Sequence, residues 1–413
     1  MNFPKSFLDY LGNLIVSCPT LRGLVPEEDV SDPYREHKKP DDPPLSWYFF
    51  SNVKFSHATA FNRVATSLYV KYLLEHPRES SYHLLTRNQF GKNRLTRGAY
   101  DELAASFYSI RNDASLSKLL DVYLIIRAYA ATKEGRTEAS LVSGREISPL
   151  FPVASATVLI ERGQFPEAKD LETGDLLFLT HAVKADLPLY EAISGEAPAS
   201  LSHAFEVETD TRIGQFTLLA NLCEIAGHAG AVTQHGSKVL TEDVAEDYLT
   251  IERHFVHRGI FASFYREEAT KLLFGSDYNM DEAIAAVRLS RMMGVPSEAR
   301  FAAEYLTRSY PTYEKFVREM SLGSPWNPHA EQPIAFVGGR RYLSNCYDLN
   351  VRSGCQLPLE RTIRTVLPSL IEKIKSVRRA SLINPPREEL IYLDLSEEAA
   401  RTARRLDALR SKP

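Results

Sequence analysis

The spacing of apolar residues is the feature that most constrains how this 413-residue chain can fold. Apolar side chains recur three and four residues apart, as at Val64, Leu68 and Tyr72, before Pro77 ends that segment. The spacing returns over 100–110, 116–131, 174–193, 241–274, 281–293, 297–308, 359–379 and 396–410. Strand patterns are sparse, and the clearest, at 334–343, predicts a hairpin around a Gly-Gly turn. The sequence therefore predicts a mainly α fold, a large helical bundle-like domain with at most a small β-hairpin element.

Proline and charge divide the chain into three parts. Residues 1–24 have the spacing of a short amphipathic helix, and the stretch at 25–46 predicts an extended surface arm that the aromatic run at 47–50 anchors. A looser stretch with glycine and proline covers 135–166. We expect an N-terminal helix and arm over 1–50, a main helical domain over 51–320, and a loop or hairpin with C-terminal helices over 321–413.

Composition and charge argue against a protein that its overall charge would draw to nucleic acid or membrane, and against a membrane-spanning protein. Hydrophobic residues make up 44% of the chain and charged residues 25%, as in ordinary globular proteins. A net charge of −4 gives no global attraction to nucleic acid or anionic membrane, although local basic patches stay open. Four scattered cysteines without a CxxC pair indicate reduced thiols and a cytoplasmic location. No apolar run approaches the ~18 residues of a membrane helix, so no membrane partner is expected.

Histidine and carboxylate are concentrated in residues 202–258. This stretch holds five of the eleven histidines, interleaved with nine acidic residues. Imidazole and carboxylate bind iron, manganese and zinc, and they are also the commonest proton carriers. If one helix ran from 202 to 226, His203 would lie ~37 Å from His228. His203 and Glu206 are therefore expected to lie outside any site that contains His228.

Glu224 is the acidic residue whose position demands an explanation. Residues 211–226 are apolar all round, which predicts a buried helix. A lone buried carboxylate costs several kcal/mol unless it is paired, protonated or metal-bound. His228 follows four residues later on the same face, although Gly227 is a candidate C-cap that would place His228 in the next loop.

The next predicted helix begins near Thr241 and carries His254 and His257 on a boundary face beside its apolar stripe. We therefore expect Glu224 and His228 to act as metal ligands or as a general base, with His254 and His257 as further ligands or proton donors. The implied cofactor is a divalent transition metal (Fe, Mn or Zn), and the implied substrate is a small polar molecule. No HExxH, Glu-x-x-His or His-Asp signature accompanies the cluster. The structural alternative is that Glu224 bonds a buried arginine or a loop amide while the histidines cap helix ends.

Two basic stretches suggest a different function. The first holds Arg87, Lys92, Arg94 and Arg97. The second spans 361–387, where seven lysines and arginines, at 361, 364, 373, 375, 378, 379 and 387, face only Glu372. Such a local excess of positive charge suits the binding of phosphate groups, and Phe90 or Tyr342 could stack on a base.

A metal-free transferase acting on a phosphate-bearing or tRNA-linked substrate is therefore one alternative, and a non-catalytic helical interaction protein is another. The chain has no Walker A, GxGxxG or GxSxG motif, which argues against P-loop NTPases, Rossmann dehydrogenases and α/β-hydrolases.

Overall fold

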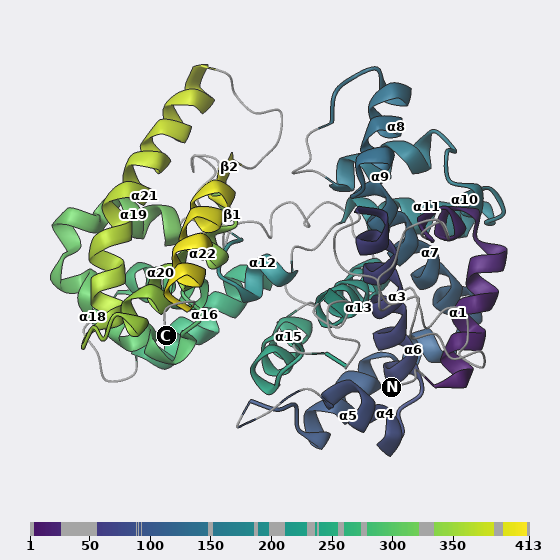
Figure 1. Cartoon of the computed structure of the whole chain (residues 1–413), viewed down its shortest axis with the longest axis horizontal. Coiled ribbons are helices and arrows are strands. Elements are labelled where there is room, and N and C mark those ends of the chain that lie inside the picture. Colours follow the sequence, from purple (N-terminus) through teal and green to yellow (C-terminus); the bar gives the residue numbers. More distant parts are fainter. Residues whose placement is uncertain are drawn as a thin grey trace. The chain divides into compact units, whose positions relative to one another are not determined.

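A computed structural model gives the fold of the chain (Figure 1). It describes residues 4–25, 56–87, 89, 91, 93–147, 152–185, 189–197, 211–228, 236–237, 239–254, 260–273, 279–321, 334–383 and 391–410. These residues are mainly helical and include one two-stranded sheet, which confirms the predicted mainly α class. The chain forms two compact units: unit 1 comprises 1–187 and 209–249, and unit 2 comprises 188–208 and 250–413.

Unit 1 is entirely helical in its described part. Its elements are α1 (Lys5–Ser17), α2 (Pro19–Leu24), α3 (Ser56–Glu75), α4 (Glu79–Thr86), α5 (Arg97–Ser106), α6 (Tyr108–Arg111), α7 (Ala114–Ala130), α8 (Lys133–Ser143), α9 (Pro152–Glu161), α10 (Pro166–Lys169), α11 (Thr173–Lys184), α13 (Thr211–His228) and most of α15 (Glu242–His254).

Unit 2 contains the sheet. Its elements are α12 (Leu189–Ile193), α16 (Ile260–Leu273), α17 (Met280–Met292), the 3-10 turn η4 (Pro296–Glu298), α18 (Ala299–Arg308), α19 (Tyr310–Ser321), β1 (Ile334–Val337), α20 (Gly339–Arg352), α21 (Pro358–Ile383), β2 (Ile391–Asp394) and α22 (Ser396–Arg410).

Local sequence sets where many of these helices begin. Thr96, Asp113 and Thr132 each accept a hydrogen bond from a backbone N–H in the first turn of α5, α7 and α8. Asn279 and Glu282 form a reciprocal capping box at the start of α17. Polar side chains at these four starts therefore satisfy backbone donors that the helix cannot satisfy itself.

The core of unit 1 is built on α3, with α7 and α13 packed against it. The α3–α13 crossing is tight because Gly227 has no side chain: a Cβ there would lie 2.6 Å from the backbone N of Ser67. The predicted role of Gly227 as a helix C-cap is wrong, since α13 continues through it to His228. This glycine permits close backbone approach instead.

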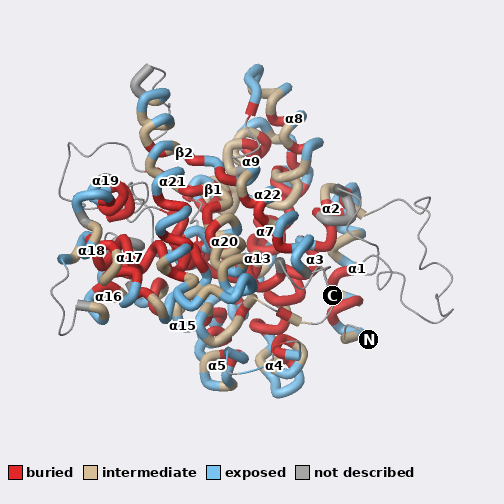
Figure 2. Tube along the Cα trace, turned by 60° about the vertical axis from the view of Figure 1, so that its left-hand side comes forward, coloured by how far each residue is buried: buried red, intermediate tan, exposed pale blue. Residues whose placement is uncertain are grey.

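The core of unit 2 surrounds α17, which Figure 2 colours as buried over most of its length. One apolar cluster links α17 with α18, α19, α20, α21 and both strands. Ile334 and Phe336 of β1 point into it together with Ile391 and Leu393 of β2. Burial alternates along both strands, so one face of the sheet packs against this cluster.

The predicted hairpin at 334–343 is wrong. The strand ends at Val337, Gly338 adopts a left-handed conformation with φ +72°, and α20 begins at Gly339. β1 pairs instead with β2 in parallel, with Ile334 opposite Ile391. The Gly-Gly pair therefore turns a strand into a helix rather than into a second strand.

The stretch at 135–166 is also more regular than its glycine and proline content predicts, because it contains most of α8, all of α9 and the start of α10. Gly135 lies inside α8, where a Cβ would come 2.3 Å from the carbonyl oxygen of Tyr129. The helix ends at Gly144, whose φ of +68° forms the C-cap. Gly135 thus permits close packing of α8, and Gly144 permits the helix to end.

Several sequence predictions fall outside the described residues. These include the arm and aromatic run at 26–50. The domain boundaries expected after residues 50 and 320 lie in or beside such segments, so they stay predictions. None of the helices in the described ranges is long and apolar enough to cross a membrane.

Candidate functional site

Glu224 has an arginine partner. Its side chain is 28% exposed, and its Oε1 lies 3.6 Å from Nε of Arg127, whose side chain is 13% exposed. Glu224 is therefore partly exposed and not buried, and of the alternatives for its partner the structure shows an arginine. Although α13 is apolar on nearly all sides, Glu224 lies where the partly exposed guanidinium of α7 supplies the counter-charge. The ion pair meets the demand for a partner without a metal.

The histidines of the predicted site fall outside the side chains that the structure describes. His228 and His254 are the last residues of α13 and α15, and their side chains lie outside the described part of the structure. His203, His235 and His257 lie outside it entirely. Among the residues that the structure does describe, no group of three or more His, Cys, Asp and Glu could hold a metal ion. The metal or catalytic roles of Glu224, His228, His254 and His257 stay predictions.

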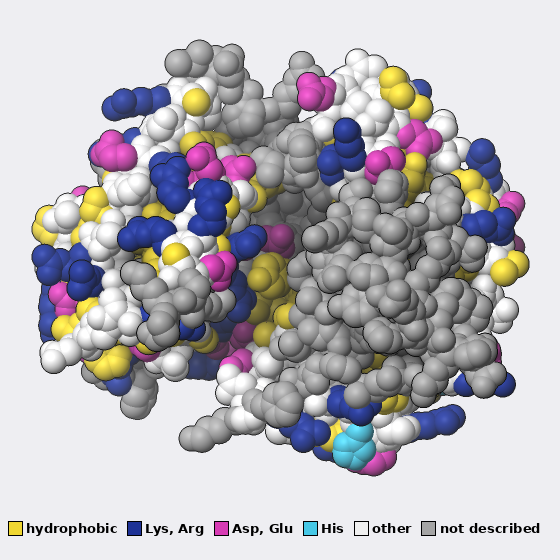
Figure 3. Space-filling model, in the orientation of Figure 1, with side chains coloured by type: hydrophobic (Ala, Val, Ile, Leu, Met, Phe, Trp, Pro, Cys, Tyr) yellow, Lys and Arg dark blue, Asp and Glu magenta, His cyan; other side chains and the backbone are white. Residues whose placement is uncertain are grey.

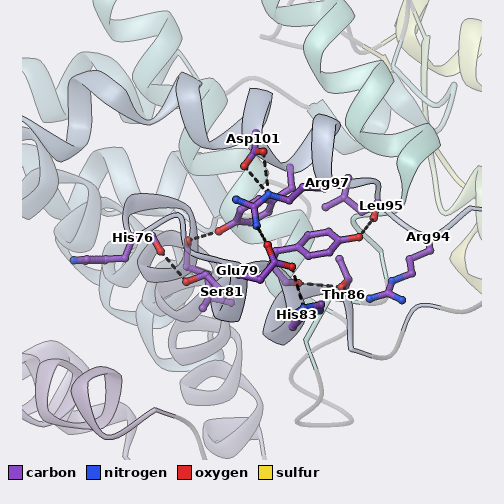
Figure 4. Close-up of polar contacts among 12 residues, drawn as sticks. His76, Glu79, Ser81, His83, Thr86, Arg94, Leu95, Arg97 and Asp101 are labelled. Atoms are coloured by element: carbon purple, nitrogen blue, oxygen red, sulfur yellow. Dashed lines mark hydrogen bonds and ion pairs between the residues drawn. The ribbon is translucent and has the colours of Figure 1, made fainter.

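The basic stretch at 87–97 contributes to the structure of unit 1. Arg97 extends from the start of α5 toward two carboxylates, those of Glu79 and Asp101 (Figure 4). Its guanidinium also lies 5.4 Å from the ring centre of Tyr100. Arg94 donates to the hydroxyl of Thr86 at 3.0 Å. These two arginines are bonded within the protein, while Lys92 and Phe90 are outside the described residues.

The second predicted stretch lies on α21, where carboxylates also accompany the basic side chains. Lys373 pairs with Glu398 of α22, and Arg378 pairs with Glu319 of α19. The remaining pairs run along the helix, Arg364 with Glu360 and Lys375 with Glu372. Arg387 is outside the described residues. The long-range pairs fasten α21 to its neighbours, so part of this positive charge has a structural use.

A basic surface nevertheless remains on α20 and α22. Over α20 and α22 themselves, seven arginines face four acidic residues, whereas the whole chain carries −4. Figure 3 shows Lys and Arg side chains gathered over the region that α22 occupies in Figure 1. We define the arginine face as the exposed arginines of these two helices: Arg341, Arg352, Arg401, Arg404 and Arg405. Of these, Arg401 forms an ion pair with Glu397 at 3.0 Å. The arginine face combines local positive charge with the planar guanidinium groups that suit phosphate oxygens.

The two helices of the arginine face are held side by side by their strands. Because β1 and β2 are parallel, α20 and α22 leave the same end of the sheet, and a Cβ on Gly338 would lie 3.3 Å from N of Ser396. Further along, the Asn345 amide donates to the carbonyl of Ala399 at 3.3 Å and to the Thr402 hydroxyl at 3.5 Å. The alignment of the arginine face thus follows from the sheet.

An aromatic and a thiol lie along the same helix pair. Tyr342 and Cys346 are half-buried on successive turns of α20. Burial raises the pKa of the Tyr342 phenol to about 12, and the positive charge of Arg401 opposes that rise. Burial likewise raises the pKa of the Cys346 thiol to about 11, against the effect of Arg405. Both groups stay neutral at pH 7, and both side chains pack in part against the apolar core of unit 2.

A buried carboxylate occupies the start of α20. Glu196, which is 6% exposed, accepts from the Arg340 N–H at 2.8 Å with Oε1 and from the Ser194 hydroxyl at 3.0 Å with Oε2. A negative group is favourable at a helix N-terminus. Burial outweighs these bonds and raises the pKa of Glu196 above its ordinary 4.5.

Glu196 makes the stability of unit 2 depend on pH. Since its pKa is higher in the folded state, the folded chain holds a proton that the unfolded chain has lost once the pH exceeds about 4.5. The stabilisation is complete below that pH and disappears as the pH rises through the folded pKa. Glu196→Gln is expected to flatten this part of the urea stability profile. A profile equally steep in both proteins contradicts the assignment, and Glu397→Gln, an exposed change on α22, is the matched control.

The sequence indicated part of this site and missed the rest. It identified the stacking potential of Tyr342, whereas the basic excess that it identified lies on α21, outside the arginine face. It missed the arginines of α22 because Glu397, Glu398 and Asp407 balance them in a linear count. Helical spacing was the usable signal, since Arg401, Arg404 and Arg405 recur three and four residues apart on an exposed face.

Comparison with known proteins assigns no family: no protein-family model matches the chain, and no curated protein or solved structure matches it either.

Proposed function

We propose that unit 2 binds single-stranded or looped RNA through the arginine face of α20 and α22. The observation that carries the proposal is the excess of exposed arginine on two adjacent helices in a chain of net negative charge. Phosphate binding needs such a local excess, and the released counterions supply much of the affinity. A net charge of −4 over the whole chain favours recognition confined to this surface.

An unpaired strand suits the arginine face better than a duplex. Aromatic rings stack on unpaired bases, and guanidinium groups bind the flanking phosphates. Tyr342 supplies a neutral, half-buried ring on α20. The positive charge of Arg401, on the neighbouring helix α22, is near enough to lower the pKa of its phenol. In this arrangement the guanidinium groups of Arg341, Arg404 and Arg405 contact phosphates along the RNA backbone. Any chemical step on a phosphate-bearing or tRNA-linked substrate stays a prediction of the sequence.

We place this function in the cytoplasm. The four cysteines, all among the described residues, carry unpaired thiols. Unpaired thiols are typical of reducing compartments. RNA is abundant there as well, so the location agrees with the proposed ligand.

Removing two charges from the arginine face is expected to weaken RNA binding. The variant Arg404→Gln/Arg405→Gln should bind a fluorescent 12-nucleotide RNA on the order of tenfold more weakly, because two phosphate contacts are lost. The slope of log affinity against log salt should fall by roughly 0.7 for each lost contact. Fluorescence anisotropy of the full chain from low to moderate salt measures both quantities.

The matched control is Arg300→Gln/Arg308→Gln, which removes the same charge from exposed positions on α18 in the same unit. It should leave affinity and salt slope near those of the unchanged chain. Equal weakening by both variants would show non-specific attraction and would contradict the proposal. The absence of salt-sensitive binding to the RNA would also overturn it. Equal binding of heparin would assign the face to polyanions in general.

A further inference from the structure

The last turn of α21 carries a sequence pattern that the proposed RNA binding does not use. Arg378 and Arg379 stand three and two residues before Ser381, and Leu382 follows it. No other serine or threonine in the whole sequence has a lysine or arginine at both of these positions. Arginine-directed protein kinases bind this pattern, because carboxylates of the kinase form charge-assisted hydrogen bonds with the two guanidinium groups. The pattern therefore indicates a phosphorylation site.

Ser381 lies where α21 opens most easily. The helix ends at Ile383, two residues later. The carbonyls of the last four residues of a helix have no donor within that helix. Figure 2 colours the last turns of α21 as intermediate and exposed, with Arg379 and Ala380 exposed and Ser381 half-buried. Because helix ends open locally at a low free-energy cost, a kinase can bind residues 378–382 in an extended form while the rest of unit 2 stays folded.

A phosphate on Ser381 would oppose the helical form of this turn. The Ser381 hydroxyl donates to the carbonyl of Arg378 at 2.8 Å. Phosphorylation replaces this donor with a group of charge about −2 whose oxygens accept hydrogen bonds. The C-terminal end of a helix already carries partial negative charge and repels such a group. The modification therefore favours an unwound last turn.

The same turn holds α21 against α19. The Arg378 guanidinium donates to both carboxylate oxygens of Glu319, from Nε at 3.1 Å and also from Nη2. Glu319 is only 8% exposed, so the pair is well sheltered from water. Side chains three residues apart on a helix are neighbours, so a phosphate on Ser381 would compete with Glu319 for the guanidinium. Phosphorylation thus acts on the contact between α19 and α21.

We infer that Ser381 is the target of an arginine-directed protein kinase, and that its phosphate releases the last turn of α21 from α19. In the transfer, Oγ of Ser381 bonds to the γ-phosphorus of ATP while the bond from that phosphorus to the β–γ bridging oxygen breaks. ADP leaves with the electron pair, and a carboxylate of the kinase takes the hydroxyl proton. The inference does not depend on RNA binding, because no residue of the arginine face enters it.

Incubation of the folded full chain with ATP and the catalytic subunit of cyclic-AMP-dependent protein kinase tests the site. Peptide mass spectrometry should find about one phosphate per chain, on Ser381. Ser381→Ala should abolish incorporation, whereas Ser369→Ala, at an exposed serine of α21 that follows no basic residue, should not. Arg379→Gln should lower the initial rate on the order of tenfold, as expected for loss of one charge-assisted contact. Arg361→Gln, also exposed on α21, is the matched control.

Hydrogen exchange of the phosphorylated chain tests the release. Amides of 378–383 should exchange faster than in the unmodified chain, and Glu319→Gln should have the same local effect without phosphate. Three results would overturn the inference: the folded chain takes up no phosphate on Ser381, Arg379→Gln and Arg361→Gln are modified at the same rate, or the phosphate leaves exchange at 378–383 unchanged. Thermal unfolding of Arg379→Gln should match that of the unchanged chain, which separates loss of kinase binding from loss of the fold.

Discussion

Lys71→Met is expected to lower the free energy of unfolding of unit 1 by about 3–5 kcal/mol at pH 7, as for other buried ion pairs that lose one partner. The Lys71 side chain is 1% exposed, and its Nζ lies 2.7 Å from Oδ1 of Asp121 and 3.3 Å from Oε1 of Glu75. It also donates to the Ser117 hydroxyl at 2.8 Å. One ammonium thus balances two carboxylates where α3 meets α7. Methionine retains the volume but leaves both acids without a cation.

Acid should reverse most of this loss. Burial raises the pKa of Asp121, and Lys71 is the main opposing influence. Without the ammonium the pKa rises further, so the variant gains stability as the pH falls and the carboxyl takes up a proton. Lys71→Met/Asp121→Asn should recover part of the loss at pH 7, because asparagine can still accept the Tyr10 hydroxyl that now bonds Asp121.

Urea unfolding with hydrogen exchange of α3 and α7 peptides measures these changes. Lys118→Met is the control, because Lys118 is exposed on α7. A Lys71 variant within about 1 kcal/mol of the control would mean that the network adds nothing beyond surface ion pairs. Failure of the double variant to recover stability would mean that lost packing, and not unbalanced charge, causes the effect.

The helices of this protein could be predicted because their signals are local. The apolar spacing over 396–410 gave α22, and the spacing before Pro77 gave α3. The hairpin failed because the partner of Ile334 is Ile391, and nothing near Gly338 in the sequence shows that a distant segment completes the sheet. The same limit applies to Lys71, whose counter-ion Asp121 is fifty residues away.

The candidate sites divide in the same way. Glu224 was correctly singled out as a carboxylate that needs a partner, but the chain offered nearby histidines, whereas Arg127 meets the need from another helix. The arginine face became evident only when the parallel strands placed α20 beside α22. The chemistry of each residue could be predicted from the sequence, whereas its partner could be identified only from the fold.

Arg288 carries the corresponding prediction for unit 2. Arg288→Met is expected to destabilise this unit by ~2–6 kcal/mol, since each buried carbonyl left without a donor costs ~1–3 kcal/mol. Two carbonyls, those of Gly195 and Met320, would lose the donor that the structure shows, whereas that of Glu196 keeps the Phe336 N–H. Arg288 is fully buried, and its guanidinium donates to the carbonyls of Gly195 at 3.1 Å, Glu196 at 3.4 Å and Met320. It also lies 5.7 Å from the ring centre of Tyr265. Among the described residues, these carbonyl groups and the Tyr265 ring surround the guanidinium. Burial lowers the pKa of Arg288.

The effect should concentrate in the segment that Arg288 holds. Gly195, with φ +80°, approaches so closely that a Cβ would lie 2.4 Å from the Arg288 carbonyl, and the Phe336 N–H donates to Glu196 O at 3.1 Å. Loss of the guanidinium should therefore expose amides of 189–197 and β1 to hydrogen exchange before α21 opens. Arg288→Lys should fail similarly, because one ammonium cannot reproduce the guanidinium's spread of donors. Arg300→Met, exposed on α18, should change neither stability nor exchange. Uniform loss of protection throughout unit 2 would show that Arg288 supports the whole core and not this segment.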